Sequence, residues 1–484
     1  MLDRFFGLSE NKTNVRTELL AGLTTFLTMA YIIFVQPAVL TQGVEGKPTG
    51  MDFGAVTTAT CLSAALATAI MALYAKYPIA QAPGMGENFF FTLTVIPAAA
   101  AMLEQEARAA GAAAGTSAWQ VALGVVFVSG VLFLLLTLLG LRQVLLDTIS
   151  PSMRHAIAVG IGLFIAFIGA RNTGLIHLSP AGPSLNPGFA SPDLIVFFFG
   201  LLLTAGLIAL GVRGAIFWGI VAATLLSAGL QFGLSHAPEA IAQSDVVAQS
   251  GLVKNFKLAA EVVSQPPSMA PTFFKMDLVR AVSWPMIPFV LIFLFMVVFD
   301  TLGTLVGVAE RAGFIKDDKL PRANEAFLSD ALGTVVGAAF GTSTVTSFIE
   351  STAGVEQGGR TGLTALTAAV LFVLALFFSP VIAMVGSYPP ITAPALVIVG
   401  SMMMQSVTKI QWPDYTEAMP AFLIIAGIPL SYSIADGLAL GFISYPIVKL
   451  IAGRGREVKW LMYLIAAVLV AYFIVIRANA TGNG

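Results

Sequence analysis

Residues 80–88 have the sequence AQAPGMGEN, and residues 341–347 have the sequence GTSTVTS. Both stretches are too polar and too rich in glycine, proline, serine or threonine to continue a helix through a lipid bilayer. Each follows a similar tetrapeptide, which is ALAT at 65–68 in one half of the chain and ALGT at 331–334 in the other. We interpret the two stretches as matched interruptions in two related halves.

The chain around these interruptions is strongly apolar. It has 484 residues, of which 57% are hydrophobic and only 11% are charged, whereas soluble domains carry about 25% charged residues. Its 35 Phe residues outnumber its 25 Lys and Arg residues. Such a chain cannot cover a surface of its size with polar groups, so we predict an all-α polytopic membrane protein that faces lipid.

Apolar runs long enough to cross a bilayer, about 20 residues each, recur along the chain. Full or nearly full runs are 17–40, 53–75, 119–142, 151–171, 193–212, 214–235, 282–307, 361–384 and 457–476. Shorter or interrupted runs are 78–99, 325–340, 343–355 and 388–404. The stretch 418–452 is too long for one helix, and Pro429 with Ser431 predicts a bend or a tight hairpin inside it. Together these runs predict about 14 segments.

Basic residues in short loops predict the orientation of the segments. One basic group precedes the first span and another follows the span that ends near residue 307: Arg4, Lys12 and Arg16, then Arg311, Lys316, Lys319 and Arg322. Both groups are cytoplasmic if about seven spans separate them, which places the N-terminus inside. Residues 1–235 are then a first inverted repeat, 236–281 an external linking loop, and 282–484 a second inverted repeat.

The interruptions predict a binding site. Lipid cannot satisfy open backbone N–H and C=O groups, so broken helices persist at membrane depth only where protein or a wet cavity supplies partners. Matched breaks in two repeats are the best sequence indication of a transporter's site, although re-entrant loops with a purely architectural role are the alternative. The glycines at 333, 337 and 341 share one helix face, and we predict that they only allow close helix packing.

Three acids in apolar surroundings are candidates for function, because a charge inside a span is unfavourable. Asp300 follows the apolar stretch 289–299, Glu350 follows the second interruption, and Glu87 lies at the end of the first. The alternative is that each caps a half-helix or pairs with an Arg. Glu87 in particular could simply complement a helix dipole.

A pocket of carboxylates suits a cation or a neutral, planar solute rich in N–H donors. Phe89, Phe90 and Phe91 offer an aromatic stacking face, and Asn88 beside them can donate and accept hydrogen bonds. We expect at least one of the three Phe side chains to face lipid. A buried carboxyl group can also take up a proton on one side and release it on the other, which would couple substrate entry to a proton gradient.

Other kinds of chemistry find little support. The single Cys61 excludes an internal disulfide, and His155, His177 and His236 form no metal-binding pair. No GxxxxGK[ST] or GxSxG motif occurs, and a net charge of −1 argues against nucleic acid as a partner. We therefore expect no enzyme activity, metal or cofactor. Arg360 could pair with an acid, although such an Arg more often marks the cytoplasmic interface.

Several of these motifs resemble those of one family. They are QAPGMG at 81–86, FDTLGT at 299–304, GTST at 341–344, and IES at 349–351 followed by GGRTG at 358–362. The chain resembles the guanine/hypoxanthine and adenine permeases, the AzgA-like purine permease branch of the nucleobase–ascorbate (xanthine/uracil permease) transporter superfamily. The resemblance runs from about residue 16 to about residue 449.

The resemblance implies about 14 segments in two inverted repeats of seven. Segments 1–4 and 8–11 would form a core domain, and segments 5–7 and 12–14 a gate domain. Segments 3 and 10 would each pair a short strand with a half-helix, and the substrate would lie between them. Asp300 and Glu350 match the two carboxylates that hold the base in such proteins.

The predicted substrate-binding residues are Asp300, Glu350, Asn88, Phe89, Thr342, Ser343 and Thr344. The predicted proton-coupling residues are Glu350, Asp300, Glu87 and Thr304. Two positions depart from the family pattern: Thr304 stands where uracil-type relatives place a proton-linked histidine, and Glu87 stands where purine permeases usually have an apolar residue.

The leading hypothesis is a secondary active transporter in the plasma (inner) membrane that imports guanine/hypoxanthine or adenine by proton symport. The alternatives are a xanthine/uracil permease and, on the same fold, a sulfate-permease-type anion transporter. Its expected partners are the nucleobase, protons and the lipid bilayer, with no nucleic acid, and a homodimer is allowed. The choice of base stays open, because one or two hydrogen-bonding groups separate the candidates.

Overall fold

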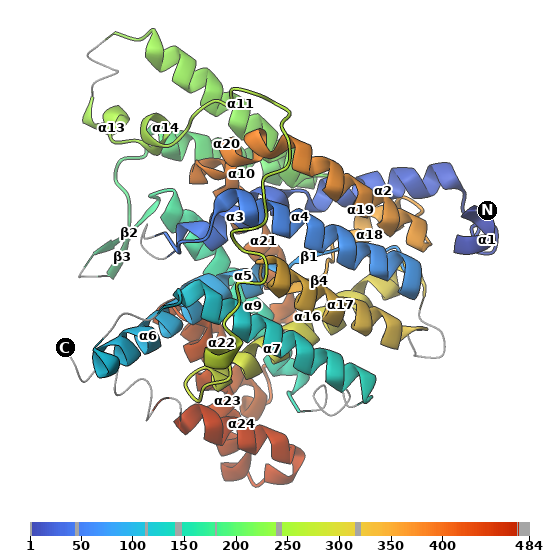
Figure 1. The fold of residues 1–484 in the computed structure, drawn as a ribbon. Helices are drawn as coiled ribbons and strands as arrows, with labels where there is room; N and C mark the ends of the chain where they lie inside the picture. The colour runs from blue at the N-terminus through green and yellow to red at the C-terminus, as the bar shows by residue number, and fades with distance from the viewer. Residues whose placement is uncertain are drawn as a thin grey trace.

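A computed structural model of the chain describes residues 2–43, 48–111, 115–140, 148–179, 182–238, 244–314 and 321–471, and residue 473. Figure 1 shows a bundle dominated by helices, with a few very short strands. The predicted all-α class is therefore confirmed. Lys316, Lys319 and parts of the predicted run 457–476 (residues 472 and 474–476) lie outside the described residues.

The first half of the chain contains the following elements in order. They are α1 (Leu2–Phe6), α2 (Val15–Met29), α3 (Tyr31–Gln42), α4 (Phe53–Ile70), η1 (Met71–Ala75), β1 (Gln81–Pro83), α5 (Met85–Phe90), η2 (Phe91–Val95), α6 (Ile96–Ala110), α7 (Ala118–Leu138), α9 (Pro151–Asn172), β2 (Ile176–Ser179), β3 (Gly182–Leu185), α10 (Pro192–Ala209) and α11 (Ala215–Ser235).

The linking segment and the second half follow. Their elements are α13 (Asp245–Ala248), α14 (Gly251–Lys254), α15 (Leu278–Ala281), α16 (Ile287–Ala312), α17 (Ala323–Phe340), β4 (Val345–Ser347), α18 (Ser351–Glu356), α19 (Gly362–Ala375), η3 (Leu376–Phe378), α20 (Ser379–Gly386), α21 (Pro389–Met403), η4 (Met404–Lys409), α22 (Tyr415–Ser431), α23 (Ile434–Ile451), η5 (Gly455–Glu457) and α24 (Trp460–Ala471).

Within the described residues, 11 helices are long and apolar enough to cross a membrane. Further candidates are α17, the β4–α18 pair and the shorter apolar helices α22 and α24, which is in line with the predicted number of about 14. The predicted bend within 418–452 is confirmed, because α22 and α23 are separate helices. Tyr432 between them has a left-handed backbone, with a φ of 56°, which lets the chain reverse within two residues.

The two interruptions meet at the centre of the molecule. Strands β1 and β4 pair antiparallel, with Gln81 opposite Ser347 and Pro83 opposite Val345. The amide of Gly84 donates to the carbonyl of Thr344 at 3.1 Å, which extends the ladder by one pair. Backbone groups that lipid could not satisfy therefore find partners in the other repeat. The predicted strand and half-helix in each repeat are confirmed.

The two half-helices differ in length. After Gly84 the first one continues from α5 through η2 and α6 as far as Ala110, whereas α18 ends at Glu356. Gly333 and Gly337 of α17 have the packing role that we predicted, whereas the prediction was incomplete for Gly341, which lies just past the helix and ends it with a left-handed backbone, φ 103°. A methyl group on Gly337 would lie 3.0 Å from Val345 Cγ2, and one on Gly333 would lie 2.9 Å from the Cβ of Ala67. These positions let α17 lie directly against β4 and α4.

The helices pack in two groups. Around the ladder, α17 packs on α4 and α7, and α19 packs on α2 and α4. In the other group, α9 packs on α21 and α22, and α22 packs on α23. The linking segment contacts both groups: the amide of Gly251 donates to Asp193 at the start of α10, and Thr58 of α4 donates to the carbonyl of Pro267.

Candidate binding site

The ladder presents a different chemistry on each of its faces, because successive side chains of an extended strand alternate. Val345 and Ser347 point toward α17. Thr346 points the other way, and its hydroxyl donates to Asp300 Oδ2 at 2.8 Å. We refer to this second face of the ladder as the Thr346 face.

Asp300 lies at the middle of α16 and is nevertheless exposed. Further along the same helical face, Gly303 is exposed as well, and a methyl group built on it would meet no atom within 4 Å. Ile349, just before Glu350, is 48% exposed. This exposed face of α16, which we call the open path, runs from Asp300 toward the end of the helix that carries Arg311, which is the predicted cytoplasmic end.

The same face of α16 is closed on the other side of Asp300. Phe289, Phe293 and Met296 precede Asp300 at helical spacing, and each is at most 5% exposed. Access to Asp300 is consequently one-sided, as expected of one conformation of an alternating-access transporter.

Glu350 occupies the cap position before α18 and is half-buried. Its Oε1 accepts a hydrogen bond from the hydroxyl of Tyr31 at 2.8 Å, and Thr28 donates to its carbonyl at 3.4 Å. Both donors belong to the first membrane-spanning segment. Glu350 is thereby oriented by the opposite repeat.

Gln36 of α3 joins several of the predicted site residues. Its amide nitrogen donates to Thr342 Oγ1 at 2.9 Å and to Ser343 Oγ at 2.8 Å. Its amide oxygen accepts from Asn88 Nδ2 at 2.7 Å. The oxygen of Asn88 is buried without a hydrogen-bond partner among the described residues, so it is available to a ligand.

Glu87 and Thr304, the other predicted residues, also lie near Asp300. Glu87 is 3% exposed, and its carboxylate folds back over Gly84. Thr304 is buried on α16, one turn after Asp300. Thr344 directly precedes β4, and its hydroxyl is buried without a partner in the part of the chain that the structure describes.

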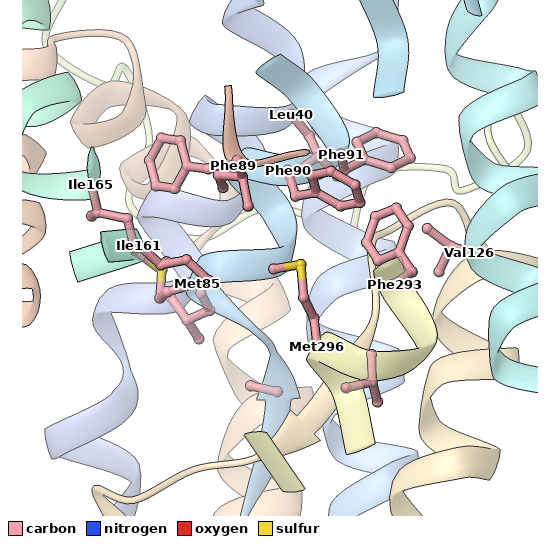
Figure 2. Close-up of a cluster of buried hydrophobic side chains, with 14 of the residues drawn as sticks. Leu40, Met85, Phe89, Phe90, Phe91, Val126, Ile161, Ile165, Phe293 and Met296 are labelled. Carbon is pink, nitrogen blue, oxygen red and sulfur yellow. The ribbon is translucent and has the colours of Figure 1, made fainter. Parts of the chain in front are cut away.

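The prediction for the aromatic run was wrong in one respect. Phe89, Phe90 and Phe91 are all buried, at 2%, 0% and 0% exposure, so none of the three faces lipid. Figure 2 shows that Phe89 lies toward Ile161 and Ile165 of α9, whereas Phe90 and Phe91 lie toward the Phe293 side. The cause is that α5 packs against α3, α9 and α16, which cover these rings.

Several residues of the site escaped the sequence analysis. Tyr31 and Gln36 lie in an apolar run, where Gln36 as an isolated polar residue was the available signal. Asp330 of α17 is fully buried behind the ladder, and it accepts from Thr301 Oγ1 at 2.6 Å and Ser347 Oγ at 2.8 Å. Asp330 could have been singled out from the sequence, because a carboxylate in an apolar segment is unusual. The acids at the two interruptions were considered in its place.

Arg360 does not reach the acids of the site. Its guanidinium donates to the carbonyls of Val355 and Gly359, and its backbone amide donates to the carboxylate of Glu18. Among the described residues, no cluster of His, Cys, Asp and Glu could hold a metal ion.

Two repeats of membrane-spanning helices that meet at broken segments, around acids with an open path to one side, define a membrane transporter rather than an enzyme. The family model Xan_ur_permease, described as the Permease family, matches residues 16–440. The chain belongs to this family, which confirms both the predicted relationship and the multi-pass membrane location.

Individual relatives cover nearly the whole chain. The guanine/hypoxanthine permease PbuO of Bacillus subtilis is 41% identical over 95% of this chain and 98% of its own length. The adenine permease AdeP of Escherichia coli is 36% identical over 99% of this chain and 97% of its own length. The fold is similar to the transmembrane domain of a cyanobacterial bicarbonate transporter, BicA, with a TM-score of 0.57, 15% identity, and coverage of 88% and 97%.

Proposed function

We propose that this protein imports purine nucleobases, guanine/hypoxanthine or adenine, together with protons. The observation that carries the proposal is the pair of carboxylates at the breaks, Asp300 and Glu350. Asp300 is exposed in mid-helix and Glu350 is half-buried, and none of the ion pairs in the described part of the chain involves either of them. Two acceptors without a cation suit the N–H groups of a neutral base.

The remaining predicted residues complete the pocket in this proposal. Asn88 offers its unpartnered oxygen as a further acceptor, and Phe89 offers a ring between α5 and α9. Thr342 and Ser343 act through Gln36, which orients Asn88. One of the acids of the site, Glu350, Asp300 or Glu87, carries a proton with the base in each cycle, because a buried carboxylate without a counter-charge is unfavourable once the site closes.

The proposal extends to the division of the chain. Residues 1–235 and 282–484 are the two inverted repeats, joined by the external segment 236–281. The group of helices around the ladder is the core domain, and the group around α9 and α21 is the gate domain. Movement of one group against the other would carry the base past Asp300.

The relatives support purine bases over the alternative substrates, because the named ones carry guanine/hypoxanthine or adenine. The similarity to a bicarbonate transporter concerns the fold alone. An anion would meet Asp300 and Glu350 as like charges, so anion transport is disfavoured. The alternative that this protein is a xanthine/uracil permease differs from our proposal only in the base that is transported.

The test is uptake of radiolabelled hypoxanthine, guanine, adenine, xanthine and uracil in cells that lack other nucleobase permeases. Wild-type protein should accumulate at least one purine, and a protonophore should collapse the accumulation, whereas removal of sodium should not. Glu350→Gln should abolish uptake at equal membrane abundance. Unchanged uptake by this variant would contradict the proposal.

A further inference from the structure

One acid of the site has no task in the proposed binding of the base. Glu87 is only 3% exposed, whereas Asp300 is exposed to the path. We propose that Glu87 and Asp300 form one proton-holding pair on the Thr346 face of the ladder, in which Glu87 keeps the coupling proton and Asp300 faces the base. This inference rests on the proposed function.

The first support is the position of the Glu87 carboxylate. A methyl group built on Gly84 would lie 2.2 Å from Glu87 Oε2 and 3.3 Å from Thr346 Oγ1. The Glu87 carboxylate thus occupies the space that a side chain at position 84 would fill. Thr346 in turn donates to Asp300 Oδ2 at 2.8 Å. The two carboxylates therefore flank a single hydroxyl group.

The second support is a hydroxyl that lacks a partner. Thr344 is fully buried, and its Oγ1 makes no hydrogen bond to any described residue. Thr344 lies opposite Gly84 in the extended ladder, and residues directly opposite each other point to the same face. The Thr344 hydroxyl is consequently directed to the space that the Glu87 carboxylate fills.

The surroundings contain acids but no cation that pairs with them. None of the ion pairs among the described residues includes Glu87. From α17, Asp330 lies on the opposite face of the ladder, and from α18, Glu350 is bonded to Tyr31. From α9, the guanidinium carbon of Arg154 lies 5.7 Å from the centre of the Phe299 ring. No further charged residue lies in α5 itself.

When the site is closed to water, two carboxylates in a low-dielectric space cannot both remain ionised without a cation, so the closed pair binds one proton. A proton needs only two oxygen atoms, whereas a metal cation needs about six. On the external side the pair takes up one proton and becomes one carboxyl and one carboxylate. On the internal side that proton leaves to water through the open path, and the pair returns to two carboxylates. No bond other than O–H forms or breaks.

The buried position of Glu87 also explains why it is not a direct ligand of the base. The open path reaches Asp300, and the Glu87 carboxylate lies behind it against Gly84. Proton exchange with water can pass through Thr346 and Asp300, whereas a purine ring cannot. Glu87 is therefore a positioning and coupling residue.

The experiment compares two readouts in proteoliposomes that contain the full-length protein. The first is counterflow of the radiolabelled purine that wild type exchanges fastest, which requires binding and alternating access. The second is accumulation of that base driven by an inward pH gradient, with internal acidification followed by a pH-sensitive dye. Glu87→Gln should lower the ratio of accumulation to counterflow by about tenfold and should lower acidification in parallel. Glu87→Asp, which retains an acid, should restore most of the ratio.

Two more variants are compared with Glu87→Gln, one at a neighbouring hydroxyl and one as a control. Thr344→Val removes the unpartnered hydroxyl at nearly constant shape and should lower the same ratio by a smaller factor. Glu261→Gln, at an exposed acid of the linking segment that belongs to none of the described ion pairs, should leave both readouts at the wild-type level. Size-exclusion profiles of all variants exclude a loss of fold as the cause.

The outcomes separate this inference from the proposed function. An unchanged ratio in Glu87→Gln would show that the pair does not hold the coupling proton. Accumulation driven by sodium instead of protons would overturn the inference as well. Equal loss of counterflow and accumulation in both Glu87→Gln and Glu87→Asp would make Glu87 a binding or structural residue. If wild type exchanges none of the purine bases, the proposed function itself fails.

Discussion

Acidic residues cluster in two regions of this molecule, the ladder and the place where the start of α22 meets the end of α23. At the ladder, Glu87, Asp300 and Glu350 have hydroxyl neighbours and form no ion pair among the described residues. At the end of α23, by contrast, Lys449 Nζ lies 3.0 Å from Glu417 and 2.9 Å from Glu457.

The second region extends into a network. Arg454 Nη1 lies 2.8 Å from Asp414, and its Nε lies 2.7 Å from Glu457. Ser150 at the start of α9 donates to Glu417 Oε2 at 2.6 Å. We call these residues the α22–α23 ion cluster. It ties three helices of one group together at their common end.

The difference between the two regions shows that a carboxylate can serve either stability or transport. A carboxylate with a fixed cation has its charge balanced in every state, so it holds helices in place. A carboxylate without a cation must find a proton or a ligand when its surroundings close. On this basis we expect substitutions in the α22–α23 ion cluster to change stability, and substitutions at the ladder to change transport.

The largest effect should come from Lys449→Met. Lys449 is 2% exposed and the Glu417 side chain is 9% exposed, so the variant leaves a buried charge without its partner. Breaking such a pair costs about 3–5 kcal/mol. The measurement is thermal unfolding of the purified protein in detergent. The double variant Lys449→Met with Glu417→Gln should recover much of the lost stability, and an equal loss in both would refute the pairing.

The next effect should come from Asp300→Asn. An acceptor that binds substrate N–H groups as a charged partner contributes about 1.5–3 kcal/mol, so initial uptake rates should fall by at least about tenfold. The unfolding temperature should stay the same or rise, because the variant removes a charge that has no cation. A large fall in that temperature would mean that Asp300 is structural, and the comparison between the two regions would break down.

A smaller effect is expected from Glu18→Gln. Glu18 is fully buried and has a third environment, in which its carboxylate accepts from Thr361 Oγ1 at 2.8 Å and Thr364 Oγ1 at 2.6 Å. It caps the start of α19 without a cation. Loss of a helix cap costs about 0.5–2 kcal/mol. Thermal unfolding should show this loss, and uptake per folded molecule should not change; a selective loss of uptake would argue against a purely structural role.

The smallest effect concerns the exposed edge of the α22–α23 ion cluster in acid. Hydrogen bonds from Thr416 and Arg454 lower the pKa of Asp414 to about 2. Hydrogen bonds from Arg454 and Lys449 lower the pKa of Glu457 to about 2. A lowered folded-state pKa adds stability that is fully present above the ordinary values, 3.8 and 4.5, and that is lost as the pH falls toward 2.

This contribution is measurable as a difference between wild type and Arg454→Gln. At pH 7 wild type should unfold at a slightly higher temperature, and the gap should shrink as the pH is lowered through about 4. Salt should also reduce the gap, because the charges are exposed. A gap that is constant between pH 7 and pH 3 would exclude these carboxylates as its source.

Much of the fold was predictable from local chemistry. Pro83 followed by Gly84 is a strong signal of an interrupted helix. The apolar runs can be counted directly, which gives the approximate number of membrane-spanning segments. The hairpin at Tyr432 followed from Pro429 and the length of the run. The aromatic run was mispredicted because enclosure of α5 by three other helices is a property of the tertiary arrangement, which no local pattern encodes.

The candidate site was predictable where a residue is unusual for its surroundings. Asp300 and Glu350 stand out because acids are rare in spans. Tyr31 does not stand out, and Gln36 does so only as an isolated polar residue, since both belong to a helix that meets the second interruption only after folding. The contact between Gln36 and Thr342 joins residues on opposite repeats, and a single sequence contains no record of such a pairing.

The ladder also has a consequence for the energetics of the cell. Because β1 and β4 meet beside the middle of α16, an ion held on the Thr346 face lies part-way through the electric field of the membrane. Moving one elementary charge through the full field is worth about 2.3 kcal/mol per 100 mV. A neutral base that travels with one proton would therefore carry current. Its uptake would respond to membrane voltage even where the proton concentrations on the two sides are equal.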